Sequence, residues 1–245
     1  MTQHIRSAAA AGFVGAAVAL AGAFGAAHFG WLPVASGPAI HDYLLAHPEV
    51  LVEASNKLQA QQVASNDSSR QTAANKLGMK AFFNRQVAFV TGPANAKTTI
   101  VEFFDYNCPY CRVSFPFVKK FYDTHRDARF SFIEFPIKGP NSTFAARAAI
   151  AAGKQPDKYL AFHFALMSEA NPVDENLVYA DAAKAGLDIG KLKADMKSPD
   201  VDLALAASHS LAQAIGVDGT PAFIINGKVR EGALDDGVLK QMTAD

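Results

Sequence analysis

The sequence predicts an α/β domain that carries an all-helical insert and follows an N-terminal helical arm. Three observations predict this class. Residues 98–137 hold two runs rich in β-branched and aromatic residues, separated by a helical pattern. From Phe144 to about Ile215 only helical patterns occur, with Ala-rich stripes and a break at Pro172. A hairpin and a helix then close the chain. Strands on both sides of a helical stretch indicate one domain interrupted by another.

Length and composition indicate a single globular domain with an insertion and argue against a nucleic-acid-binding protein. The 245 residues suit one domain with an insertion, with roughly 150 residues per domain as a soft prior. Half of the residues are hydrophobic and 18 are Phe, so the chain can form a full hydrophobic core without disulfide or metal cross-links. Lys plus Arg and Asp plus Glu number 23 each, which gives a formal net charge of zero. Since no basic patch or RNA-binding pattern occurs, no nucleic-acid partner is expected.

Residues 1–33 form a targeting segment. No Asp, Glu, Lys or Arg follows Arg6 within it. As a helix, residues 8–32 would be about 37 Å long, enough to cross a hydrocarbon core of about 30 Å. Two uses stay open: a membrane anchor, which Trp31 at the interfacial position favours, or a signal peptide with Ala21-Gly22-Ala23 as its cleavage site. Because the positive charge lies only on the N-terminal side, both uses place the rest of the chain outside the cytoplasm.

Residues 34–90 are predicted to form a helical arm. Apolar residues recur at helical spacing along its first part, and Pro48 suits the first turn of a second helix. These positions are Ile40, Leu44, Leu51, Ala54 and Leu58. After a polar stretch, a second apolar cluster consists of Leu77, Met79, Phe82 and Phe83. Two interpretations stay open: helices packed on the chain's own domain, or an oligomerisation segment.

The elements of the domain follow in order. "TTIVEFFDY" (98–106) is a buried strand by composition, and residues 109–125 follow as a helix with one apolar face. "ARFSFIEFPI" (128–137) alternates like a second strand. "TPAFIINGKVREG" (220–232) gives two short strands joined by Asn226-Gly227, a strong hairpin signal. A C-terminal helix closes the chain.

The chain has two cysteines, Cys108 and Cys111, and both lie in "DYNCPYCRVSFP". Pro109 suits the first position of a helix, so that Cys108 is the N-cap. Its sulfur then faces unpaired backbone N–H groups at the positive end of the helix dipole, which favours the thiolate. Cys111 lies one helical turn away. The pattern predicts an exposed attacking thiol, Cys108, and a more buried resolving thiol that releases a mixed disulfide.

Other uses of the pair fit less well. A ring closed across two residues constrains little of the unfolded chain, so structural bracing is a poor explanation. Structural zinc needs four ligands, and no second C-x-x-C or H-x-x-x-H completes a site. His163 is expected to be a packed helix histidine, and His125 to end a helix. No metal site and no cofactor are predicted. A copper- or zinc-binding protein that uses the two thiolates stays as the alternative function.

The stretch "IVEFFDYNCPYC", with "GVDGTPAFIING" about a hundred residues later, resembles the DsbA-like thiol:disulfide interchange proteins of the thioredoxin superfamily. The resemblance covers roughly residues 98–245. It implies a thioredoxin domain over 91–245 with a helical insert at about 142–215. It also implies that Cys108 is the nucleophile and Cys111 the resolving thiol. Thr220 and Pro221 would form a cis-proline loop that faces the pair and binds the substrate backbone.

Further site residues follow from the same resemblance. Glu102 matches a buried acid of the family, which implies that it takes and returns the proton of Cys111. Asp105 is ambiguous and is expected to end the strand. The dipeptide Pro109-Tyr110 and the residue Thr220 tune thiolate stability and substrate contacts. Here Pro-Tyr replaces the Pro-His of the best-known oxidase, and Thr220 replaces Val. Strong oxidising power is therefore not implied.

"IHDYLLAHPEVLVEA" and "FPIKGPNSTFAARAAIAA" resemble the branch related to suppressor of copper sensitivity protein C. Members of that branch are oligomers built through the N-terminal arm, trimers in some cases, and some act as disulfide isomerases. The resemblance implies an exported thiol-disulfide oxidoreductase that forms, reshuffles or reduces disulfides in periplasmic proteins. Its implied partners are cysteine-containing exported substrates, a membrane redox partner that resets the pair, and further copies of the chain. In the periplasm the chain is anchored to the inner membrane by residues 8–32 or soluble after cleavage.

Overall fold

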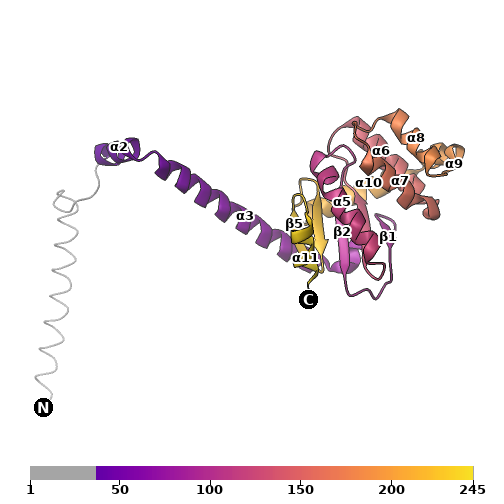
Figure 1. Cartoon of the computed structure of the whole chain (residues 1–245), viewed down its shortest axis with the longest axis horizontal. Coiled ribbons are helices and arrows are strands. Elements are labelled where there is room, and N and C mark those ends of the chain that lie inside the picture. Colours follow the sequence, from indigo (N-terminus) through magenta and orange to yellow (C-terminus); the bar gives the residue numbers. More distant parts are fainter. Residues whose placement is uncertain (1–36, 245) are drawn as a thin grey trace, which may run out of the picture. The chain divides into compact units, whose positions relative to one another are not determined.

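A computed structural model describes residues 37–244 (Figure 1). They belong to two compact units that meet within one long helix, between Gln61 and Gln62. The predicted signal peptide or anchor, residues 1–33, lies outside the described residues. Within residues 37–244, no helix combines the length and the apolar character needed to cross a membrane.

The first unit consists of α2 (Gly37–Ala46) and the N-terminal part of α3 (Glu49–Leu77). Glu49 places a negative charge in the first turn of α3, where it interacts favourably with the helix dipole. Large apolar side chains on this unit are exposed. They are Ile40, Tyr43, Leu45, Leu51, Val52 and Leu58. The apolar residues that the sequence places at helical spacing are thus largely uncovered in the single chain.

The second unit contains a five-stranded sheet with the order β1-β3-β2-β4-β5. The strands are β1 (Phe89–Thr91), β2 (Thr99–Phe104), β3 (Arg129–Glu134), β4 (Ala222–Ile225) and β5 (Lys228–Glu231). β2 and β3 are parallel, and the other neighbouring pairs are antiparallel. The central strand β2 is covered on both faces, which explains its nearly continuous apolar sequence. The edge strand β1 was not predicted, because three residues are too few to show an alternating pattern.

Helices complete the second unit and confirm the predicted order of elements. Between β2 and β3 lies α5 (Pro109–Thr124), and α11 (Asp236–Thr243) ends the chain. The insert between β3 and β4 consists of α6 (Pro140–Ala152), α7 (Pro156–Ser168), α8 (Glu175–Lys184), α9 (Ile189–Asp195) and α10 (Pro199–Ala214). Figure 1 shows α6, α7, α8 and α9 gathered into one cluster of helices. The insert is all-helical, as predicted.

Each face of the sheet has its own apolar core. On one face, Ile100 and Phe104 pack with residues of α5 and of the inserted helices. On the other face, Phe103 packs in a cluster with Ala74 of α3 and Phe82 of α4 (Met79–Phe82). The C-terminal part of α3 therefore packs on its own domain, which is the first of the two interpretations of the arm. For residues 37–61, the role in oligomerisation stays a prediction.

Candidate active site

The two cysteines lie at the amino end of α5. Cys108 is the N-cap residue, with extended backbone angles, and Pro109 is the first helical residue, as predicted. The Arg112 N–H donates to the Cys108 carbonyl at 3.2 Å and so begins the helical ladder. The Cys108 side chain makes no capping hydrogen bond. Its sulfur lies at the positive end of the helix dipole, where the unpaired N–H groups of the first turn favour a negative charge.

A distant loop completes the site. The Thr220–Pro221 peptide bond is cis, as predicted, and it directly precedes β4. β4 pairs antiparallel with β2, with Ala222 opposite Phe103. This loop therefore lies at the end of β2 that leads into the cysteine turn, the residues 105–108 between β2 and α5. The Cys108 thiol donates to the Thr220 carbonyl at 3.1 Å. The structure thus brings together the thiol and the loop that the sequence resemblance had paired with it.

Cys108 is less exposed than predicted. Only 1% of Cys108 is exposed and none of Cys111, whereas Tyr110 between them is 66% exposed. The prediction of an exposed attacking thiol is wrong for this structure, because the Thr220–Pro221 loop lies against the sulfur. The dipeptide, and not the sulfur, forms the outer surface at this point.

The two thiols differ strongly in acidity. The hydrogen bond with Cys111 is the main cause that lowers the pKa of Cys108 from 9.0 to about 5. The Thr220 side chain and backbone N–H groups add to this effect, and burial opposes it. Burial is the main cause that raises the pKa of Cys111 far above its ordinary value, followed by the hydrogen bond with Cys108 and the charge of Glu102. At neutral pH the site therefore holds a Cys108 thiolate beside a Cys111 thiol.

Glu102 is a buried acid beneath this pair. It lies on β2 and is 3% exposed, on the face that packs with α5. Burial raises its pKa from 4.5 to about 8. A carboxyl group with a pKa near neutrality can both take and return a proton at physiological pH. Because the charge of Glu102 acts on Cys111, the two groups are electrostatically coupled.

Asp105 does more than end the strand. Its carboxylate accepts hydrogen bonds from the backbone N–H groups of Asn107 at 2.7 Å, Ile137 at 2.7 Å and Lys138 at 2.8 Å. The residue is 1% exposed, so these N–H groups satisfy a buried charge. Asp105 therefore joins the cysteine turn to the loop that follows β3.

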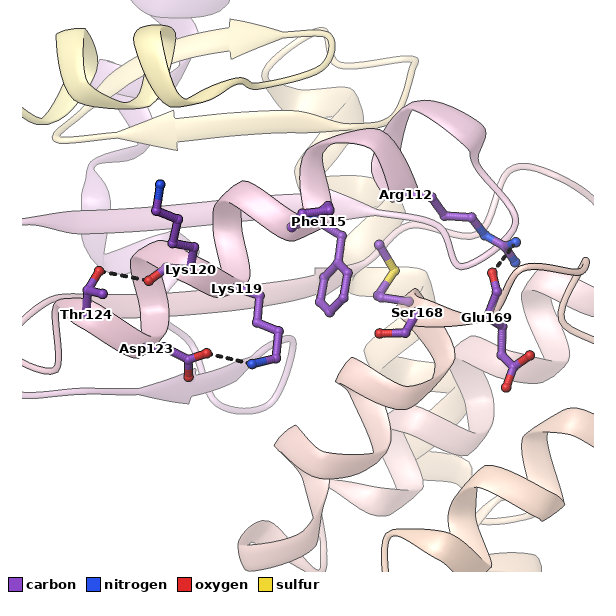
Figure 2. Close-up of a pocket in the computed structure, with 10 residues that line it drawn as sticks. Arg112, Phe115, Lys119, Lys120, Asp123, Thr124, Ser168 and Glu169 are labelled. Carbon is purple, nitrogen blue, oxygen red and sulfur yellow. Dashed lines mark hydrogen bonds and ion pairs between the residues drawn. The ribbon is translucent and has the colours of Figure 1, made fainter.

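Two residues that the sequence reasoning missed hold the turn from the side of the insert. The Asn107 side chain donates to the Val173 carbonyl at 3.0 Å and accepts from the Val173 N–H at 2.7 Å. Arg112 donates to the Tyr106 carbonyl at 2.9 Å and to the Glu169 carbonyl at 2.8 Å (Figure 2). Val173 lies 66 residues from Asn107, and Glu169 lies 57 residues from Arg112. No local pattern could have indicated them.

A groove of about 640 Å³ begins beside the pair at Arg112 and follows α5. Phe115 points into it, and the charged side chains of Lys119 and Asp123, paired at 2.5 Å, lie farther along the same helix (Figure 2). The end of α7 forms the opposite wall, with Met167, Ser168 and Glu169. An apolar surface with a charged rim thus adjoins the cysteine turn.

The described residues offer no conventional metal centre. No group of three or more His, Cys, Asp or Glu side chains within residues 37–244 is arranged to hold a metal ion. His163 is packed in the core, as predicted, with its Nδ1 at 3.0 Å from the Tyr106 hydroxyl. His125 is the C-terminal cap residue of α5, also as predicted. No feature of this part of the chain favours the metal-binding alternative.

Comparison with known proteins decides the family. Residues 99–242 match the DSBA-like thioredoxin domain. The chain belongs to the DsbA-like thioredoxin family. The predicted thioredoxin fold with inserted helices is thereby confirmed, as is membership of a family of thiol–disulfide oxidoreductases. Residues 37–64 in addition match the N-terminal domain of the copper resistance protein ScsC. This second match agrees with the branch that the sequence indicated.

Individual relatives support the same assignment. Disulfide bond formation protein D of Bacillus subtilis (strain 168) is 30% identical over 166 residues, which are 62% of this chain and 73% of the relative. A thioredoxin-like oxidoreductase from Silicibacter pomeroyi DSS-3 is 40% identical, with a TM-score of 0.63, over 67% of this chain and 95% of that one. ScsC of Proteus mirabilis, in a transitional conformation, is 29% identical with a TM-score of 0.63, over 84% of this chain and 92% of that one. The last similarity extends beyond the thioredoxin domain.

Proposed function

We propose that this protein exchanges disulfides with cysteine-containing proteins in the periplasm through Cys108-Pro109-Tyr110-Cys111. The observation that carries the proposal is the contrast between the two thiols, one acidic at a helix N-terminus and one buried and protonated. In the oxidised protein, a substrate thiolate attacks the Cys108 sulfur, and Cys111 leaves as a thiolate. A second substrate thiolate then attacks the mixed disulfide at the substrate sulfur. The substrate disulfide forms, and Cys108 leaves as a stabilised thiolate.

The reverse sequence reduces or reshuffles disulfides. The Cys108 thiolate attacks a substrate disulfide, and Cys111 attacks the resulting mixed disulfide after losing its proton. Thr220 and Pro221 are proposed to bind the substrate backbone beside the reacting sulfur. Their position against Cys108 supports this role, because any chain joined to that sulfur must pass the loop.

Glu102 is proposed to take the proton of Cys111 and return it. In this role, Glu102→Gln slows the resolution of mixed disulfides, since glutamine accepts no proton at neutral pH. The same variant is expected to be more stable than the parent at pH 7 by about 3 kcal/mol, because the parent must protonate or bury a charge there. A raised carboxyl pKa costs stability as pH rises from about 4.5 to about 8. The gain should therefore vanish below pH 4.5.

Urea unfolding at several pH values measures the stability gain, and rapid mixing of the preformed mixed disulfide measures resolution. Faster or unchanged resolution in Glu102→Gln would contradict the proposed proton transfer. A gain that stays constant down to pH 4 would show that the carboxyl does not titrate between pH 4.5 and 8 in the folded protein.

The location and partners are proposed from the same resemblance. We place the protein in the periplasm, anchored by residues 8–32 or released by cleavage, with a membrane redox partner that resets the pair. We also propose self-association, as a trimer, through the arm. The exposed apolar side chains of α2 and α3, Leu51 and Leu58 among them, support this, as does the match of residues 37–64 to the ScsC N-terminal domain.

The experiment that tests the function is the redox equilibrium of the cysteine pair against glutathione, read by gel shift after thiol alkylation. A stabilised thiolate favours the reduced protein and so makes the disulfide a better oxidant. The reactive thiol of thioredoxin has a pKa of about 7, and its disulfide a potential of about −270 mV. For DsbA the pKa is about 3.5 and the potential about −120 mV. With a Cys108 pKa of about 5, a value between these limits is expected. A potential at or below that of thioredoxin would make the protein a reductase that a partner keeps reduced, and a pair that never equilibrates would refute the proposal.

A further inference from the structure

We propose that Asn107 is a positioning residue, through which the inserted helical domain holds the Cys108 sulfur against the Thr220 loop and governs its reactivity. The proposal rests on the function above in one respect, that Cys108 is the reacting thiol. Asn107 touches neither sulfur. It acts through the backbone of the turn that carries Cys108.

The cysteine turn is tied down on the sheet side by its own residues. The Cys108 N–H donates to the Asp105 carbonyl at 3.0 Å, and the Asp105 carboxylate binds the N–H groups of Ile137 and Lys138. These contacts fix where the turn leaves β2. The Asn107 N–H also donates to the Asp105 carboxylate, at 2.7 Å, so the backbone of the turn is held to Asp105, and only side chains connect the turn to the insert.

A second set of contacts joins the turn to the insert. Asn107 uses both the donor and the acceptor of its side-chain amide on a single residue, Val173. Two hydrogen bonds to one residue fix the orientation of the Asn107 amide as well as its distance from the insert. Val173 lies between α7 and α8 and is fully buried, so the anchor itself is held by the core of the insert.

Arg112 strengthens the same connection from the first turn of α5. Its guanidinium joins the Tyr106 carbonyl, at the base of the turn, to the Glu169 carbonyl at the end of α7 (Figure 2). The turn, the active-site helix and the segment between α7 and α8 are thus linked by four side-chain hydrogen bonds. Arg112 also carries a charge, so replacing it would change the electrostatics of the site and its geometry together. Asn107 is neutral, so its replacement isolates the geometric effect.

The position of the turn matters because the Cys108 sulfur depends on close contacts. It lies 3.1 Å from the Thr220 carbonyl and at the amino end of α5, and the interaction with Cys111, one helical turn away, is the main cause that lowers the Cys108 pKa. Hydrogen bonds weaken steeply with small changes in distance and angle. A turn released from Val173 holds the sulfur less firmly beside Cys111 and the amino end of α5, which are the contacts that favour the thiolate. The thiolate then loses stabilisation, and the oxidised form of the pair becomes relatively more stable.

The test is Asn107→Ala in the full chain, with Asn171→Ala as the matched control. Asn171 is an exposed asparagine between α7 and α8, two residues before Val173. Its side chain forms no hydrogen bond with the described residues of the cysteine turn. The thiolate absorbance of the reduced protein is titrated with pH, and the glutathione equilibrium is measured. In Asn107→Ala the titration midpoint is expected to rise by about 0.5–1 pH unit, a three- to tenfold change in the thiolate-to-thiol ratio. The glutathione equilibrium should shift in the same proportion towards the disulfide, and Asn171→Ala should match the parent.

Thermal unfolding of the oxidised and reduced forms separates positioning from simple stability. If both forms of Asn107→Ala lose the same stability and the midpoint and equilibrium stay at the parental values, the residue is merely structural and the proposal fails. Should the variant not fold, Asn107→Ser, which keeps a smaller hydrogen-bonding group, is measured in the same way. A parent midpoint near that of an ordinary thiol would instead refute the proposed role of Cys108, so the two failures are distinguishable.

Discussion

Cys108→Ala is expected to abolish disulfide exchange completely, and Cys111→Ala to trap mixed disulfides between Cys108 and its substrates. The first variant removes the only thiol that is ionised at neutral pH in the described site. The second keeps that nucleophile but removes the group that releases it, since Cys111 is the neighbouring thiol one helical turn away. The two cysteines should therefore fail in different ways, one without any covalent intermediate and the other with an accumulated one.

Incubation with a reduced and with a misoxidised cysteine protein, followed by acid quench and non-reducing electrophoresis, measures both outcomes. Val113→Ala is a suitable control, because this residue lies on the same helix, is exposed and has a side chain that forms no hydrogen bond with either cysteine. Free turnover by Cys111→Ala would refute the assignment of the resolving thiol. Mixed disulfides that form through Cys111 in Cys108→Ala would reverse the two roles.

The thiolate of Cys108 is expected to titrate with a midpoint of about 5. At pH 7 about 99% of such a thiol is ionised, compared with about 3% for an ordinary cysteine with a pKa near 8.5. The main cause is the hydrogen bond with Cys111, so Cys111→Ala should raise the midpoint most. Cys111→Ser keeps a hydrogen-bond donor and should raise it less. The ultraviolet absorbance of the thiolate, followed across pH in the reduced protein, measures each value.

Thr220 provides a second check on the same property. Its hydroxyl oxygen is buried and has no hydrogen-bond partner other than the Cys108 sulfur among residues 37–244, so it can donate to the thiolate. Thr220→Val keeps the shape of the side chain but removes this donor. The titration midpoint of the Cys108 thiolate in Thr220→Val should lie above that of the parent and below that of Cys111→Ala. A parent midpoint near 8 would contradict the stabilisation of the thiolate altogether.

The lowered pKa also fixes how the stability of the reduced protein depends on pH. The folded protein binds the Cys108 proton less tightly than the unfolded chain does. The free energy of unfolding of the reduced protein therefore increases as pH rises from about 5 towards the ordinary thiol pKa, and this contribution is lost as pH falls through about 5. The oxidised protein has no such group. The melting temperature of the reduced form, relative to that of the oxidised form, should therefore rise between pH 5 and pH 8.

The proposed self-association through the arm would determine how this chemistry is presented to substrates. Thiolate stabilisation favours oxidation of substrates, whereas a trimer would hold several pairs together and favour reshuffling. The apolar side chains of residues 37–61 are exposed in the single chain, and the thioredoxin domain does not need them for its own core. Oligomeric state and redox equilibrium together would distinguish an oxidase from an isomerase.

The local features of this protein could be predicted from the sequence alone. A run of β-branched and aromatic residues specifies β2, and Pro109 fixes the start of α5 and hence the cap position of Cys108. Asn226-Gly227 specifies the hairpin between β4 and β5, and both residues have positive φ. These features follow from backbone preferences of a few neighbouring residues, which any fold must respect.

Only the tertiary structure decided how the thiol pair is surrounded. Cys108 is covered by a loop 112 residues away, Asp105 binds the chain beyond β3, and Asn107 binds Val173. The short edge strand β1 likewise forms because β3 is there to pair with it. Such contacts depend on how the insert and the sheet pack together. A polar residue in a turn has the same local pattern whether it faces water or anchors an active site, and its partner is chosen by the fold.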